Sequence, residues 1–122
     1  MNRSSPLRLA AYLGHMREAI ERCLTYVQGM DEASFMADPK TQDAVIRGFE
    51  VIGEAASNIK RHFPDFARQQ PDLPLGMAIG MRNALSHGYF TVDLQMVWRS
   101  IHADLPPLLE LVRRLVEPPG PS

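Results

Sequence analysis

The feature that most constrains the fold is the spacing of apolar residues, which recur every three or four positions along most of the chain. One series is Leu9, Leu13, Met16, Ile20, Leu24 and Val27, and a second is Val45, Phe49, Ile52, Ala56, Ile59 and Phe63. This spacing lines one side of an α-helix with apolar side chains, whereas a strand would need alternation at every second position. Because no alternating segment of any length occurs, the sequence predicts an all-α fold, an up-and-down bundle of four to five helices.

Proline and capping residues predict where the first two long helices begin and end. Ser5-Pro6 and Asp38-Pro39 each combine a side chain that can cap a helix with a proline, which is tolerated at the first helical position. We expect one helix from Pro6 to near Gly29 and another from about Pro39 to about His62, before Pro64 ends it. Residues Pro64 to Leu73 are expected to form a proline-rich connector.

The second half of the chain predicts a third helix and a fourth that is interrupted. The third begins near Pro74 and ends at Gly88. Asp93 is a suitable N-cap for the fourth, whose apolar positions stay in phase across Pro106-Pro107, where we expect a kink or a restart. With 122 residues and 45% hydrophobic content, the chain predicts a single domain over residues 1–117, followed by a disordered tail at 118–122.

Charge and cysteine content narrow the classes of partner and compartment. The formal net charge of −1 gives no global basic field, so binding to nucleic acid would need a local patch or two chains pooling their arginines. The single Cys23 excludes a disulfide framework and a cysteine-rich zinc site, and it is expected to be a small buried hydrophobe. No secretory or membrane-spanning pattern is present, so we expect a cytoplasmic protein without membrane or DNA partners.

The most unusual stretch is RNALSHGY, Arg82 to Tyr89, which places a cation, an amide, an imidazole and a phenol close together in otherwise apolar, helical sequence. Gly76 and Gly80 precede it at helical spacing, and each costs ~1 kcal/mol relative to Ala inside a helix. Two such glycines predict that another helix or a ligand approaches the backbone there. The structural alternative is that Arg82 and His87 only complement the helix dipole at a solvated C-terminus.

The pattern R-N-x-L-x-H-x-Y resembles the signature of the HepT-like toxins, a branch of the HEPN superfamily of small helical ribonucleases. The similarity extends through segments of matching order and spacing, Thr41 to Ala56, Ile79 to Trp98, and Asp104 to Leu108. The first forty residues resemble the family only as an amphipathic helix. The resemblance implies a HEPN-like, homodimeric helical fold and metal-independent cleavage of RNA, with tRNA among the candidate substrates.

The residue types suit that chemistry. His87 can take a proton from a ribose 2′-hydroxyl or give one to the leaving oxygen, and Arg82 can stabilise the charge that develops on phosphorus. Asn83 could orient either group. On a continuous helix, positions 82 and 87 differ by about 140°, so the helix must end for His87 to swing round, or the His must meet an Arg from another chain. Neither His15, His62 nor His102 completes a ligand set, so no metal or cofactor is expected.

The family resemblance also implies a partner and a modification. In HepT-like systems an MntA-type nucleotidyltransferase antitoxin transfers AMP to the Tyr of the motif, a type VII-like toxin-antitoxin pairing, and Tyr89 occupies that position here. The alternative for Tyr89 is that its ring packs on the fourth helix.

Two questions stay open from the sequence. Glu54 either lies exposed beside the helix seam or turns towards a cation such as Arg82, which would make it a supporting site residue. The competing function is a non-catalytic helical dimer that only binds the nucleotidyltransferase. Near-neutral charge favours that alternative, whereas the intact Arg82, His87 and Tyr89 favour cleavage.

Overall fold

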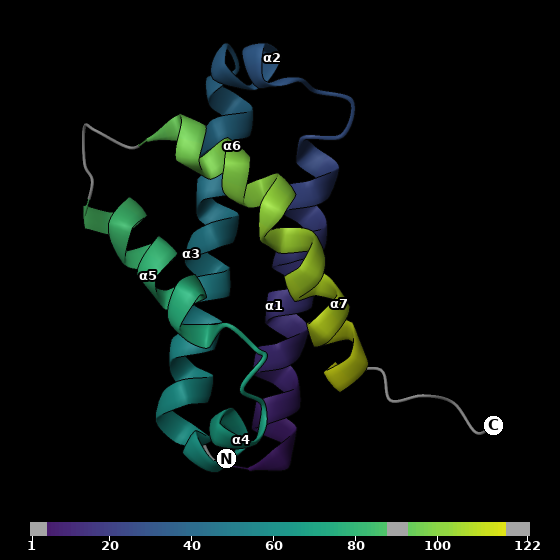
Figure 1. Cartoon of the computed structure of the whole chain (residues 1–122), viewed down its shortest axis with the longest axis vertical. Helices are drawn as coiled ribbons and strands as arrows, with labels where there is room; N and C mark the ends of the chain where they lie inside the picture. Colours follow the sequence, from purple (N-terminus) through teal and green to yellow (C-terminus); the bar gives the residue numbers. More distant parts are fainter. Residues whose placement is uncertain (1–4, 88–92, 117–122) are drawn as a thin grey trace, which may run out of the picture.

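The computed structural model describes residues 5–87 and 93–116, apart from the side chain of His87, and confirms the all-α prediction. The described ranges contain seven helices and no strand (Figure 1). They are α1 Pro6–Tyr26, α2 Glu32–Met36, α3 Pro39–His62, α4 Pro64–Gln69, α5 Leu75–His87, α6 Leu94–Ala103 and α7 Leu105–Val116. Five of these are long, as predicted, and the short α2 and α4 are additional.

Two long helices, α1 and α3, form the centre of the molecule and run side by side in opposite directions (Figure 1). The α5 helix packs against α3, and α7 packs against α1 on the other side. The α6 helix crosses in front of this layer and contacts α2 and α7. This arrangement leaves α5 as a flanking helix whose main neighbour is α3.

Capping and close packing explain why α1 and α3 form where they do. The Ser5 side chain accepts a hydrogen bond from Arg8 N at 3.3 Å, and Asp38 accepts one from Thr41 N at 3.2 Å, so the starts of both helices are satisfied. At Gly48 a Cβ would collide with Cys23 Sγ, so the glycine lets α1 and α3 approach closely. Burial raises the pKa of the Cys23 thiol to about 12, which makes it an inert packing group.

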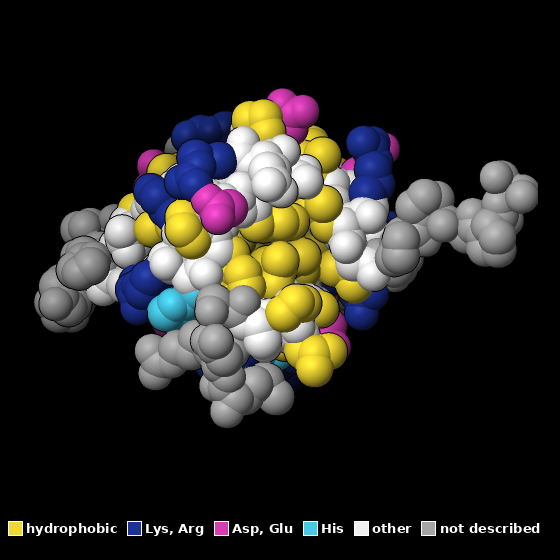
Figure 2. Space-filling model, turned by 90° about the horizontal axis from the view of Figure 1, so that it is seen from below, with side chains coloured by type: hydrophobic (Ala, Val, Ile, Leu, Met, Phe, Trp, Pro, Cys, Tyr) yellow, Lys and Arg dark blue, Asp and Glu magenta, His cyan; other side chains and the backbone are white. Residues whose placement is uncertain are grey.

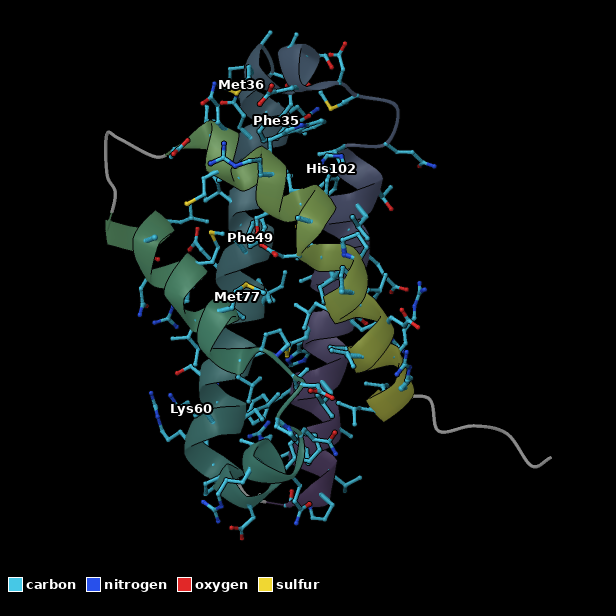
Figure 3. All side chains as sticks on the ribbon, viewed as in Figure 1. Phe35, Met36, Phe49, Lys60, Met77 and His102 are labelled. Atoms are coloured by element: carbon cyan, nitrogen blue, oxygen red, sulfur yellow. The ribbon has the colours of Figure 1, made fainter. Side chains whose placement is uncertain are left out.

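The core includes the two predicted apolar series, which lie along α1 and α3. Its largest fully buried side chains lie on α1, α2, α3, α6 and α7 and include Met16, Ile20, Phe35, Val45, Ile52, Ile59, Val97, Ile101, Leu105, Leu108 and Val112. Trp98 is partly buried, and its ring centroid lies 5.2 Å from that of Phe35. The predicted core residue Phe49 is buried (Figure 3).

Two short helices and one helix boundary differ from the sequence predictions. The α2 turn was not predicted; Asp31 and Ser34 form a capping box, and Phe35 is buried. Within the predicted connector, Pro64 opens the short helix α4. The predicted restart near Pro106-Pro107 occurs slightly earlier, between Ala103 and Leu105, since prolines are accepted in the first turn of α7.

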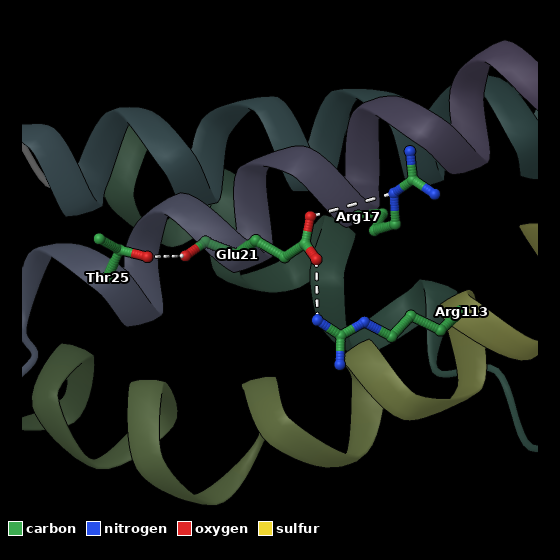
Figure 4. Close-up of polar contacts among 4 residues, drawn as sticks. All are labelled: Arg17, Glu21, Thr25 and Arg113. Atoms are coloured by element: carbon green, nitrogen blue, oxygen red, sulfur yellow. Dashed lines mark hydrogen bonds and ion pairs between the residues drawn. The ribbon is translucent and has the colours of Figure 1, made fainter.

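An ion-pair network joins α1 to α7 at the surface (Figure 4). Glu21 accepts a hydrogen bond from Arg113 at 2.8 Å and lies 4.0 Å from Arg17. Its backbone carbonyl also accepts a bond from the Thr25 hydroxyl at 2.9 Å. These groups are partly exposed, so the network contributes about 1 kcal/mol or less. Among the described helices, none is both long and apolar enough to cross a membrane.

Candidate functional site

The candidate site is organised on α5, which is held against α3 along one face. Leu75, Ala78 and Leu85 of α5 are buried, and they recur at the helical spacing that forms a single stripe. The opposite face of α5 carries Gly76 and Gly80, both exposed. The helix therefore has one packed face and one face open to solvent.

The Arg82 side chain crosses α3 at a glycine. A Cβ built at Gly53 would collide with Arg82 Cβ and would lie 2.9 Å from the carbonyl oxygen of Ala78 and 3.0 Å from Arg82 Cδ. Any side chain at position 53 would therefore push α5 away from α3. The absence of a side chain at Gly53 lets the aliphatic stem of Arg82 lie on the backbone of α3 as far as Cδ.

The electrostatic surroundings of Arg82 leave its charge available. The residue is half-buried. Within the described ranges, the ion pairs involve other arginines, at positions 17, 47, 68, 113 and 114, and none involves Arg82. A guanidinium whose stem is packed and whose charge is not neutralised by a carboxylate is suited to bind an anion such as phosphate.

The two predicted catalytic positions lie on different sides of the same helix. Residue 87 is still helical, so α5 is regular from Arg82 to His87 and these positions differ by about 140° around the axis. Position 87 falls on the same side as the exposed Gly76, Gly80 and Asn83. Position 82 faces α3, so within one copy of the chain positions 82 and 87 do not face the same side of α5.

Gly76 and Gly80, whose positions predicted the approach of another helix or a ligand, have no other helix close to them within the described residues. Among the described residues, a Cβ at Gly76 or at Gly80 would meet nothing within 4 Å, because both glycines face outward. The close approach occurs instead at Gly53 of α3. The partner of Gly53 becomes apparent only when α3 and α5 are placed together.

The remaining predicted site residues are placed as follows. Asn83 is exposed on α5, one residue beyond Arg82. Glu54 is exposed on α3, and no ion pair between it and Arg82 occurs among the described residues. The side chain of His87, the predicted stop at Gly88 and the predicted acceptor Tyr89 lie outside what the structure describes.

A hollow at the contact between α3 and α5 was not predicted as part of a site. Ser57, Lys60, Arg61 and Ile79 line an open hollow of about 440 Å³ between α3 and α5, which we call the α3–α5 hollow. Lys60 and Arg61 lie in the last turn of α3, where cations also suit the negative end of the helix dipole. Among the described residues, no group of three His, Cys, Asp or Glu side chains is arranged to hold a metal ion.

Comparison with known proteins identifies related sequences over most of the chain. The profile of the family described as "Ribonuclease HepT-like" matches residues 16–115, a span that contains α3, α5 and the whole Arg82–Tyr89 motif. No solved structure matches significantly.

Individual relatives agree with the family match. The "Probable ribonuclease HepT" of Thermococcus cleftensis is 40% identical over 97 residues, which cover 80% of this chain and 86% of that protein. A "putative RNase" of Caldanaerobacter subterraneus subsp. tengcongensis is 30% identical over an alignment of 106 residues, which covers 87% of this chain and 92% of that protein. A Methanocaldococcus jannaschii protein named as a gamma-glutamylcyclotransferase and "putative RNase" is 35% identical over 87% of this chain, but over only 46% of its own length.

Proposed function

Because the chain belongs to the HepT-like ribonuclease family, we propose that it is a metal-independent endoribonuclease whose site is formed by Arg82 and His87 at the interface of a homodimer. The observation that carries the proposal is the placement of Arg82. Its stem lies on Gly53, and no carboxylate among the described residues pairs with its charge. Electrostatic stabilisation depends on charges that are already in position before the reaction begins, and a packed arginine meets this requirement.

The proposed reaction transfers a phosphoryl group within the RNA, from the 5′-oxygen of one nucleotide to the 2′-oxygen of the preceding ribose. The imidazole of His87 removes the proton from a ribose 2′-hydroxyl, and the 2′-oxygen then attacks the adjacent phosphorus. Negative charge builds on the phosphate oxygens and is stabilised by Arg82. The bond from phosphorus to the 5′-oxygen breaks, that oxygen takes the proton held by the His87 imidazolium, and the products are a 2′,3′-cyclic phosphate and a free 5′-hydroxyl.

The dimer is proposed because α5 stays helical from position 82 to position 87. With the two positions about 140° apart, the arrangement that brings both functional groups to one phosphate pairs Arg82 of one protomer with His87 of the partner subunit. The open face of α5, with Gly76 and Gly80, would allow the second copy to approach closely. A two-fold axis beside this face would generate two equivalent composite sites.

Two further residues have supporting roles in the proposal. Asn83 is exposed next to Arg82 and has both donor and acceptor groups to orient the scissile phosphate or the imidazole. Glu54 follows Gly53 on α3 and is exposed, so we assign it a position at the edge of the site without a role in the proton transfers.

We further propose that the ribonuclease is a type VII-like toxin, held inactive by an MntA-type nucleotidyltransferase that transfers AMP to Tyr89. The modification would add a phosphodiester charge and a base two residues from His87, where they would compete with RNA for Arg82. Incubation with the partner and ATP should add the mass of AMP to the wild type but not to Tyr89→Phe. Full neutralisation of the Tyr89→Phe toxin by the partner would contradict this mechanism.

The primary test is cleavage of RNA by the purified protein in the presence of a chelator. We expect the wild type to cut RNA in EDTA and His87→Ala to be inactive while retaining its helical circular dichroism. In bacteria, expression of the wild type should arrest growth and expression of His87→Ala should not. Loss of wild-type cleavage in EDTA would contradict a metal-independent mechanism.

A second candidate function is a non-catalytic dimer that binds the nucleotidyltransferase. The observation in its favour is the net charge of −1, which is unusual for a protein that must attract RNA. If that function is correct, the wild type binds the partner but does not cut RNA under any condition in which related ribonucleases are active.

A further inference from the structure

We propose that the α3–α5 hollow is an RNA-backbone subsite, in which Lys60 and Arg61 bind phosphates that flank the one cleaved beside Arg82. This inference rests on the proposed function and extends it to a second set of residues. It also addresses the low net charge of the chain, because a substrate needs a local basic surface and not a basic protein.

The first support is continuity with Arg82 along one seam. Gly53, Ser57 and Lys60 follow one another on α3 at steps of four and three, so they lie on the side that faces α5. Arg82 lies on Gly53, and Ile79, about one turn before Arg82 on α5, lines the hollow. The hollow is therefore an extension of the surface that positions Arg82.

The second support is the chemistry of the hollow. Its lining consists of two cations, one hydroxyl and one aliphatic side chain, with no acidic residue. Within the described ranges, neither Lys60 nor Arg61 takes part in an ion pair. Figure 3 shows Lys60 extending from α3 on the side where α5 packs. Exposed ammonium and guanidinium groups beside a hydroxyl are a common arrangement for contacting phosphate oxygens.

The third support is distance and accessibility. Lys60 is seven positions from Gly53, which corresponds to about 10 Å along α3, so a strand bound at Arg82 would bring neighbouring phosphates to the hollow. Figure 2 looks at the end of the molecule where α3 ends and shows Lys and Arg side chains beside an apolar patch. Both Lys60 and Arg61 are exposed and can reach an extended ligand without rearrangement of the helices.

The competing explanation is that these cations only complement the C-terminal dipole of α3. The two explanations differ in what a substitution changes. Loss of a dipole contact would alter stability alone, whereas loss of phosphate contacts would weaken RNA binding and reduce its dependence on salt.

The test measures binding of a labelled single-stranded RNA across a series of salt concentrations, in a His87→Ala background that cannot cut it. Lys60→Ala/Arg61→Ala should lower the salt slope by about 1.4, since each phosphate contact on a single strand contributes about 0.7. In the catalytically intact protein, the same pair should raise KM about fivefold for each lost contact at 0.1 M salt, with kcat unchanged.

The matched control is Lys40→Ala/Arg99→Ala, which removes the same charge from exposed positions away from the seam. Lys40 is about 30 Å from Lys60 along α3. The control pair should leave KM unchanged and the slope close to that of the parent.

An unchanged slope and KM in Lys60→Ala/Arg61→Ala, with only a lower melting temperature, would overturn the subsite. A loss confined to binding of a protein partner would also overturn it. If the wild type binds RNA but does not cut it, the proposed function fails while the salt slope still decides the role of the hollow. If the parent binds no RNA, both proposals fail.

Discussion

At the scale of single residues, Arg82 combines two roles that substitutions can separate. Its stem fills the space above Gly53, and its guanidinium is proposed to bind phosphate. Truncation to Ala removes both the packing and the charge, so activity lost in that variant would be difficult to interpret. Variants that keep the stem are more informative.

We expect Arg82→Met to keep the fold and to lose at least about a hundredfold in kcat/KM, equivalent to ~3 kcal/mol of transition-state stabilisation. Arg82→Lys should recover only part of the activity, because an ammonium cannot contact two phosphate oxygens in the planar manner of a guanidinium. RNA cleavage rates and melting temperatures of both variants test this. Near wild-type cleavage by Arg82→Met would show that the charge at this position is not used.

At the scale of secondary-structure elements, the seam between α3 and α5 predicts opposite effects for two glycine substitutions. Gly53→Ala should cost about 1–3 kcal/mol, since its Cβ collides with Arg82 and α5 must shift. It should also reduce cleavage, because Arg82 would move with α5.

The matched substitution is Gly80→Ala, whose Cβ meets no atom of the described part of the protomer within 4 Å. A better helix former at this position should stabilise the isolated protomer by up to ~1 kcal/mol. If a second copy packs on this face, the same methyl group should weaken dimerisation. Urea denaturation and sedimentation of both variants separate these effects, and a destabilising Gly80→Ala together with a neutral Gly53→Ala would contradict the assignment of the two faces.

The start of α3 predicts a pH-dependent contribution to stability. The hydrogen bonds that Asp38 accepts from the Thr41 hydroxyl and backbone N–H lower the pKa of its carboxyl below 3.8. A group whose pKa is lower in the folded state stabilises the fold above its unfolded value, and this contribution disappears as the pH falls through the folded value. Asp38→Ala should therefore be less stable than the wild type at neutral pH, and this difference should shrink in acid below pH 3.8.

Urea titrations at several pH values measure this difference. Asp43→Ala is a suitable control, because it removes an exposed carboxylate from the same helix without removing the cap. A difference between wild type and Asp38→Ala that stays constant down to low pH would show that the carboxylate does not act through its ionised form.

A helix could be predicted where the sequence carries a clear local signal, such as a capping residue, a proline or a long apolar series. Both ends of α3 were predicted correctly, because Asp38-Pro39 caps its start and Pro64 prevents its continuation. The single turn α2 was missed because Phe35 is its one buried residue, and a periodic pattern cannot be detected over so short a segment. The capping box of Asp31 and Ser34 was the available signal.

The candidate site was predictable as a list of residues but not as an arrangement. Arg82 and His87 stand out in the sequence because the pattern R-N-x-L-x-H-x-Y gathers them with an amide and a phenol within eight residues. The contact of Arg82 with Gly53, and the position of Lys60 beside the same seam, depend on how α5 packs against α3. No local pattern encodes that packing.

At the scale of the whole molecule, the proposed active site requires two copies of the chain. The described protomer holds Arg82 against α3 and carries position 87 on the outer side of α5. The proposed active unit is therefore a dimer, and RNA would cross from the α3–α5 hollow of one protomer to the exposed α5 face of the other.

The most direct test is to mix two inactive variants, Arg82→Met and His87→Ala, and to assay RNA cleavage in EDTA after the subunits have exchanged. If each site takes Arg82 from one protomer and His87 from the partner subunit, every mixed dimer contains one intact site. Random exchange of equal amounts should then restore roughly a quarter of wild-type activity, because half of the dimers are mixed and each has one of two sites. No recovery, with subunit exchange verified by mass spectrometry, would contradict a site shared between two chains.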